Sequence, residues 1–278
     1  MEENDFYKFG MKKLKGESSK FVLIPYELIT DTSIHKFRSL VYCYVYLKSG
    51  MDNTLLFNTE NFKQYAYKKT GVPNPTDTYA DRVIEVLNSI KDKWFLFYDG
   101  DIKKKQYKSM VFDKDKMYEY CSDNRFAVVY LDELNTILSY KSNDTHDNRF
   151  DNSMILLVFM YIRANIPIRH NKYSSNVEAY NAYYKSIGEE IGLSERMVSK
   201  CVDVLVRLGL LYVKERSSIK YYDKKSKSYK FRTPTIVFCN TYRRIKKGID
   251  VYLDNTGENY YLPEIENKIK YLEKHNIW

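Results

Sequence analysis

Glycine, proline and cysteine are scarce in this sequence, which has 10 Gly, 6 Pro and 4 Cys among 278 residues. No apolar run approaches the roughly 18 residues that a membrane span needs, and residues 1–16 lack the apolar stretch of a secretory signal. We therefore expect a soluble, cytoplasmic protein with no membrane partner. The cysteines show no CxxC pairing, and each sits among apolar or aromatic neighbours, which is typical of reduced, buried thiols: Cys43, Cys121, Cys201 and Cys239.

Motifs for catalysis are missing as well. The four histidines are scattered, with no His-x-His or His-x-x-x-His spacing, which argues against a nickase that uses a tyrosine nucleophile beside a metal. No phosphate-binding GxxxxGK or GxGxxG loop occurs either. We therefore expect a protein that is not an enzyme and that holds no metal and no cofactor.

Hydrophobic residues and locally concentrated positive charge are abundant. The chain is 44% hydrophobic, with 28 Tyr and 14 Phe, which excludes an intrinsically disordered protein. Its net charge is +9, and residues 201–250 alone hold 13 Lys and Arg against 4 Asp and Glu. The other 228 residues therefore balance, with 32 basic and 32 acidic groups. A local surplus of this kind indicates an anionic partner.

The chain contains one order of segments twice. FVLIPYELIT (21–30) and FAVVYLDEL (126–134) are both predicted to be strands. A long apolar helix is predicted after each, in residues 33–50 and 152–166. Two further helices and two strand-like runs around a polar tip then follow. The helices are predicted in residues 58–71 and 75–93 of the first repeat and in residues 184–192 and 194–209 of the second.

Strand, helix, helix, turn, helix and β-hairpin is the order of a winged helix-turn-helix, and its repetition strengthens the interpretation. The alternative is another α+β packing of the same elements. The predicted fold class is α+β, mainly helical, with two tandem winged helix-turn-helix domains. The predicted boundaries are a flexible basic arm (1–20), domain 1 (21–120), domain 2 (121–247) and a C-terminal extension with an amphipathic helix (248–278).

The third helix of the second repeat has the pattern of a DNA-reading helix. In SERMVSKCVDVLVRLG (194–209), an apolar stripe recurs at helical spacing and leaves polar residues on the opposite face. A short turn through Gly192 and Leu193 precedes it, as in helix-turn-helix motifs. Such a helix fits the DNA major groove, where Arg196 can bind guanine and Lys200 guanine or phosphate. The predicted DNA-contacting residues are Ser194, Arg196, Ser199, Lys200 and Arg207; the alternative is an ordinary solvated face.

The hairpin that follows carries eight basic residues against only Glu215 and Asp223. A hairpin this rich in cations is favoured by contact with phosphates, although lysines also protect exposed strand edges from aggregation. The predicted wing contacts are Lys214, Arg216, Lys220, Lys224, Lys225, Lys227, Lys230 and Arg232.

The first repeat differs at the corresponding positions. Its third helix is predicted to expose Asp77, Asp81 and Glu85, with only Arg82 and Lys91 in compensation. An acidic face is unsuited to a DNA groove, so this repeat either contacts DNA through its own tip or serves protein contacts such as self-association. The tip residues in question are Lys103, Lys104, Lys105 and Lys108.

The residues IPYELITDTSIHKFRSLVYCYVYL (24–47) resemble the opening of replication initiator and replisome-organiser proteins from plasmids, phages and mobile elements of Gram-positive bacteria. IGEEIGLSERMVSKCVDVLVRLGLL (187–211) is similar to the helix-turn-helix that such proteins share with many transcription regulators. KKTGVPNPTDTYADR (68–82) departs from the pattern, being longer and more acidic.

The resemblance implies a sequence-specific protein that binds repeats of double-stranded DNA in a replication origin and organises the replisome. Its implied partners are double-stranded DNA, further copies of the chain on that DNA, and a host helicase or helicase loader. The alternative function is that of a winged-helix transcriptional regulator.

Overall fold

The computed structural model describes residues 21–50, 52–70, 77–140, 151–166, 179–216, 219–223, 228–232 and 235–239. The fold is α+β, with many helices and small antiparallel sheets. The contacts divide the chain into two compact units: unit 1 comprises residues 1–165 and 182–210, and unit 2 comprises residues 166–181 and 211–278. The predicted basic arm (1–20) and C-terminal extension (248–278) lie outside the described residues.

The first repeat contains eight elements in sequence, all in unit 1. They are β1 (Phe21–Pro25), α2 (Tyr26–Thr30), α3 (Arg38–Lys48), β2 (Thr54–Phe57), α4 (Thr59–Thr70), α5 (Asp77–Ile90), β3 (Leu96–Phe97) and β4 (Lys108–Phe112). Its three-stranded sheet has the order β2-β4-β3, with both pairings antiparallel. Helix α6 (Lys114–Asp123) then leads to the second repeat.

The second repeat presents the same order of elements. It contains β5 (Phe126–Tyr130), α7 (Leu131–Leu138), α8 (Asn152–Asn165), β6 (Ala179–Ala182), α9 (Tyr184–Ile191), α10 (Glu195–Arg207), β7 (Tyr212–Arg216) and β10 (Thr235–Cys239). An additional hairpin, β8 (Ile219–Asp223) and β9 (Ser228–Arg232), lies between β7 and β10 in the sequence. The sheet order β6-β10-β7 corresponds strand for strand to β2-β4-β3. The repetition seen in the sequence is therefore also a repetition of topology.

The opening strands of the two repeats pair with each other. Strands β1 and β5 are antiparallel, and their register places Leu23 opposite Val128 and Pro25 opposite Phe126. Four of the five β1 side chains are hydrophobic residues at most 1% exposed, so this ladder belongs to the core of unit 1. The pairing joins the first repeat to the N-terminal part of the second through backbone hydrogen bonds.

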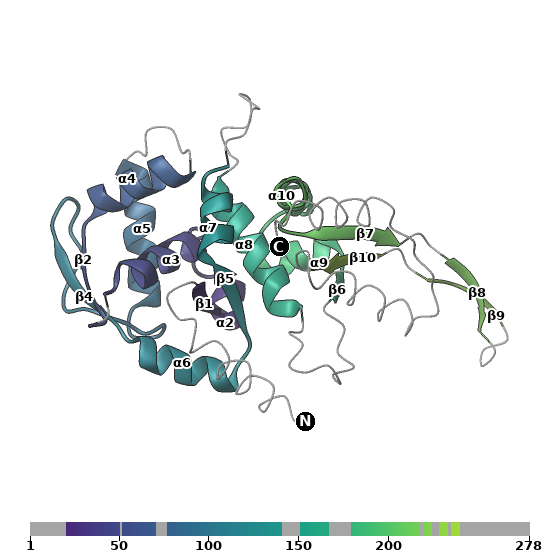
Figure 1. Cartoon of the computed structure of the whole chain (residues 1–278), viewed down its shortest axis with the longest axis horizontal. Coiled ribbons are helices and arrows are strands. Elements are labelled where there is room, and N and C mark those ends of the chain that lie inside the picture. The colour runs from purple at the N-terminus through teal and green to yellow at the C-terminus, as the bar shows by residue number, and fades with distance from the viewer. Residues whose placement is uncertain are drawn as a thin grey trace, which may run out of the picture. The chain divides into compact units, whose positions relative to one another are not determined.

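Helices α3 and α8 form the centre of unit 1. In α8 every residue from Asn152 to Ile162 is buried, which fits its lack of a polar face. In α3 the buried residues run continuously from Arg38 to Tyr46. Figure 1 shows β2 and β4 at one edge of the unit and α8 towards the other, with α3 between them. No helix among the described residues is both long and apolar enough to cross a bilayer.

Several sequence predictions need correction. The segments 21–30 and 126–134 are strands only over their first five residues and then become helices α2 and α7, because the backbone turns at Pro25 and Tyr130. Helix α3 begins at Arg38 and not at residue 33, since Asp31 and Ser33 form a local turn. The short strands β2 and β6 and the helix α6 were not predicted, because four-residue strands are too short to show a clear alternation and α6 buries only Met117 and Cys121.

Candidate nucleic-acid interface

The turn between α9 and α10 depends on two glycines. Gly192 ends α9 with φ +76°, a left-handed conformation that glycine adopts without steric cost, and its N–H donates to the Gly188 carbonyl. The Leu193 N–H donates to the same carbonyl at 2.9 Å. A Cβ on Gly188 would lie well inside 3.0 Å of the Leu193 carbonyl oxygen. The close approach of turn and helix therefore requires glycine at position 188.

Helix α10 begins at the residue that the sequence predicts as its cap. The Ser194 hydroxyl accepts a hydrogen bond from the Met197 N–H at 3.3 Å. One face of the helix is buried through Val198, Cys201, Val202, Val204 and Leu205, while Leu208 is half-buried at the C-terminal end. The amphipathic prediction for residues 194–209 is therefore confirmed.

The candidate DNA-reading residues differ in how far their side chains are exposed. Ser194, Arg196 and Arg207 are exposed, whereas Ser199 and Lys200 are half-buried. The Arg207 Nε donates to the Asp203 carbonyl at 3.3 Å, so this guanidinium is partly held against its own helix. Arg196 thus combines exposure with a position in the first turn of α10, where a groove-reading side chain is required.

A buried arginine from the first repeat supports the turn in front of α10. Arg38 is 1% exposed, and its Nη2 donates to the Ile191 carbonyl, the last residue of α9, at 2.9 Å. Its Nε and Nη2 also donate to the Ile29 carbonyl at 3.1 and 2.7 Å, and its Nη1 donates to the Ile34 carbonyl at 3.0 Å. One guanidinium therefore ties α2, α3 and the C-terminal end of α9 together.

The electrostatics of Arg38 suit this position. Burial lowers the pKa of its guanidinium to about 10, and the negative charge of Asp31 opposes that shift. The group is still protonated at neutral pH. Helix C-terminal carbonyls carry partial negative charge, so Ile29 and Ile191 provide favourable acceptors for a buried cation. Sequence periodicity gave no indication of this role, because Arg38 reads as an ordinary charged residue at the start of a helix.

The predicted wing residues lie partly on described strands of unit 2. Strand β7 pairs with β10, with Arg216 opposite Thr235 and Lys214 opposite Val237. In the β8–β9 hairpin, Lys220 is opposite Phe231, Tyr221 is opposite Lys230, and Ile219 is opposite Arg232. The remaining predicted wing contacts lie outside the described residues: Lys224, Lys225 and Lys227.

The basic tip of the first repeat is fixed to neighbouring helices. Lys105 has φ +63°, and this left-handed backbone is held on both sides. Its N–H donates to the Thr59 hydroxyl at 2.9 Å, and its carbonyl accepts from the Asn58 side chain at 3.1 Å. Lys104 forms an ion pair with Asp81 of α5 at 2.7 Å. The tip thereby covers the start of α4 and part of α5.

These contacts correct one sequence prediction. The acidic face of α5 is compensated by the tip residue Lys104 as well as by Arg82, whose guanidinium pairs with Glu85 at 2.8 Å. Of the other tip lysines, Lys103 is exposed, and Lys108 is half-buried with its Nζ 6.0 Å from the centre of the Tyr98 ring. Lys103 and Lys105 are therefore the tip lysines that remain exposed and form no ion pair with another described residue.

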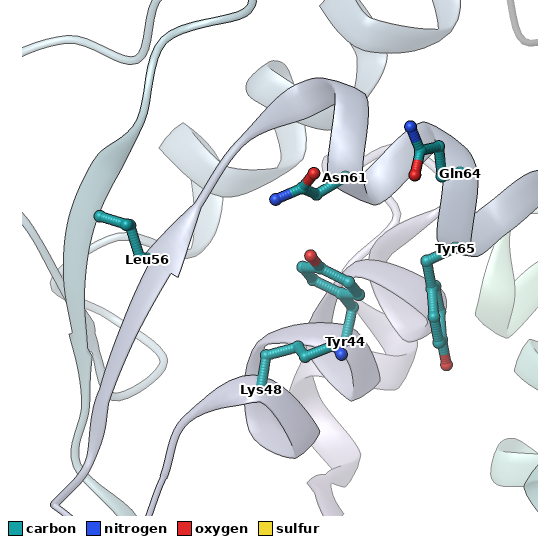
Figure 2. A pocket seen from close by; sticks show the side chains of 6 residues that line it. All are labelled: Tyr44, Lys48, Leu56, Asn61, Gln64 and Tyr65. Atoms are coloured by element: carbon teal, nitrogen blue, oxygen red, sulfur yellow. The ribbon is translucent and has the colours of Figure 1, made fainter.

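A hollow of about 370 Å³ opens on the first repeat between β2, α3 and α4. It is lined by Tyr44, Lys48, Leu56, Asn61, Gln64 and Tyr65. Figure 2 shows the Tyr44 hydroxyl directed towards Asn61, with Leu56 on the strand across from them. Burial raises the pKa of Tyr44, so its hydroxyl is a neutral hydrogen-bond donor at physiological pH.

Three of the four cysteines are shown to be buried, as the sequence predicts. Cys43, Cys121 and Cys201 are free thiols, and burial raises the pKa of each. Thiols of this kind pack as small hydrophobic groups and are poor nucleophiles. Within the part of the chain that the structure describes, no group of three or more His, Cys, Asp or Glu side chains could hold a metal ion.

No family model matches this chain, and no curated protein matches it.

Proposed function

We propose that this chain is a sequence-specific double-stranded DNA-binding protein with two tandem winged-helix modules. In this proposal α10 is the recognition helix, and the basic residues from β7 to β9 form the wing contacts. The observation that carries the proposal is the α9–turn–α10 arrangement, in which Arg196 is exposed on the first turn of an otherwise half-buried helix.

The topology supports the winged-helix interpretation. In each repeat, the helices and the strands of a three-stranded sheet follow one another in the same order, and the sheet order places the last strand between the other two. The position of the charge supports DNA as the partner. All of the net charge of +9 is accounted for by residues 201–250, which begin within α10 and include the whole hairpin. A cationic ribbon that follows a reading helix in the chain suits binding to phosphates on both sides of a groove.

The first repeat serves a different role in this proposal. Its helix α5 is paired with the tip of the same repeat through Lys104 and Asp81, so neither presents a free basic surface at that point. We assign this repeat to self-association on DNA, with Lys103 and Lys105 as secondary phosphate contacts.

The proposed biological role is replication initiation of a plasmid, phage or mobile element, with recruitment of a host helicase or helicase loader. The alternative role is that of a transcriptional regulator, which would use the same helix and wing. Two modules in one chain favour an origin with iterated repeats. Direct repeats beside the gene would support initiation, whereas one inverted repeat over a promoter would support regulation.

A gel-shift titration on duplex DNA from around the gene, across salt concentrations and with competitor DNA, tests the proposal. If about six wing cations neutralise phosphates, log affinity should fall with log salt at a slope near −5. Arg196→Ala should relax base preference at one position and cost about 1–3 kcal/mol. Lys224→Ala with Lys225→Ala should weaken binding to all sequences alike and reduce the salt slope by about 2.

Matched controls separate these effects from loss of charge in general. Arg82→Ala removes an exposed arginine from α5, the corresponding helix of the first repeat. Lys93→Ala with Lys116→Ala removes two lysines that are 60% and 65% exposed and lie outside both tips. Both controls should bind like the parent. If the Arg196 and wing variants also bind like the parent, α10 and the hairpin are not the DNA-binding surface.

A further inference from the structure

The hollow on the first repeat has the chemistry of a binding site and is not used by the proposed recognition helix. It lies between the edge strand β2, the C-terminal half of α3 and the first two turns of α4. Its volume of about 370 Å³ falls at the lower end of the range of about 300–1,000 Å³ that small-molecule sites occupy.

The polar groups around the hollow have no side-chain hydrogen bond to any other described residue. They are the Tyr44 hydroxyl, the Lys48 ammonium, and the Asn61 and Gln64 amides. Lys48, Asn61 and Gln64 are exposed, so their hydrogen-bonding capacity is available to a ligand. The two amides provide both donors and acceptors, as base edges require.

Charge and aromatic content restrict the class of ligand. Lys48 is a cation, and no acidic side chain lines the hollow, so an anionic group is favoured. Tyr65 is half-buried, with its ring centre 5.0 Å from that of Tyr44, and Leu56 is 61% exposed on the opposite wall. A flat aromatic group of a ligand can therefore contact the tyrosine rings and Leu56, while the edge of the group meets the side-chain amides of Asn61 and Gln64.

We propose that this hollow binds a nucleotide of an unpaired strand, with the base against Tyr44, Asn61 and Leu56 and a phosphate at Lys48. The inference rests on the proposed nucleic-acid function and assigns the first repeat a ligand that suits its acidic third helix. Asp81 and Glu85 are exposed on α5, which disfavours a duplex backbone along that helix, whereas no acidic side chain lines the hollow. Stacking on aromatic side chains and a cation for the backbone are the usual means of single-strand binding.

Titration of the full-length chain with the 5′-phosphorylated dinucleotides pTpT and pApA, followed by NMR, tests this site without requiring the unknown DNA target. We expect saturable binding by the parent. The double variant Lys48→Met, Asn61→Leu should weaken it at least tenfold. The matched variant Lys93→Met, Gln106→Leu removes the same two chemical groups from exposed positions elsewhere on the first repeat, and it should bind like the parent. All four substituted residues are exposed, so both double variants should have the melting temperature of the parent.

The outcomes distinguish this site from the proposed duplex interface. Arg196→Ala should leave dinucleotide binding unchanged, and the hollow variant should leave duplex binding unchanged. If the chain fails to bind duplex DNA but binds dinucleotides through Lys48 and Asn61, only the proposed duplex interface is overturned. Absence of saturable dinucleotide binding, or equal loss in both double variants, would overturn this proposal. Binding of a capped Thr-Val-Thr-Val peptide in place of the dinucleotides would identify a peptide groove along the edge of β2 instead.

Discussion

Replacement of Arg38 by methionine tests how the first repeat supports the turn before α10. Methionine has similar length and fills the space, but it removes the four hydrogen bonds that Arg38 donates to the carbonyls of Ile29, Ile34 and Ile191. Each buried acceptor left without a partner costs about 1–3 kcal/mol. The loss is partly offset, because the variant no longer buries a cation whose pKa desolvation has lowered. We therefore expect a net destabilisation of about 3 kcal/mol.

Thermal and urea denaturation measure this change. For a unit of this size, about 2–4 °C of melting temperature corresponds to each kcal/mol, so the midpoint should fall by about 6–12 °C. Native-state hydrogen exchange should locate part of the loss in the last turn of α9, since the lost hydrogen bond to Ile191 holds the end of that helix. Arg38→Lys keeps the charge but cannot donate in a fork, so it should fall between the parent and Arg38→Met.

The matched control is Arg82→Met, which removes a guanidinium whose side chain is 49% exposed and paired only on the surface with Glu85. Exposed ion pairs contribute about 0–1 kcal/mol, so its midpoint should stay within about 3 °C of the parent. If Arg38→Met unfolds no more easily than Arg82→Met, the hydrogen bonds to the three carbonyls do not stabilise the fold, and the reasoning is refuted.

Three further results are expected. Gly188→Ala should destabilise the chain by about 1–3 kcal/mol in urea denaturation, because its methyl group meets the Leu193 carbonyl, whereas an unchanged midpoint would mean that the turn can move aside. Ser194→Ala should cost about 1 kcal/mol through loss of the cap on α10, and Ser194→Asp should restore most of it. Brief iodoacetamide treatment followed by mass spectrometry should label the buried thiols only after unfolding, and labelling in the native state would show that they are accessible: Cys43, Cys121 and Cys201.

Local sequence patterns were sufficient for most helices. The spacing of apolar and polar residues in 194–209 predicts both the buried stripe and the exposed Arg196. A helix of 3.6 residues per turn brings these positions onto opposite faces. Ser194 and Gly192 likewise mark the helix ends, because capping involves neighbouring residues only. The hydrophobic run in residues 152–166 predicts the buried helix α8, because a helix with no polar face must be covered on all sides.

Tertiary structure decided the features that depend on residues far apart in the chain. The two similar strand segments were recognised as repeats, but only the fold pairs them with each other, because strand partners are set by long-range register. The hydrogen bond from Arg38 spans 153 residues and follows no periodicity. The ion pair of Lys104 with Asp81 and the hollow beside Tyr44 likewise bring together residues that are far apart in the sequence. The sequence by itself determined where most of the helices lie and where the charge is concentrated, since both follow from neighbouring residues. Which of those charges stay exposed and which support the fold depended on packing between distant elements.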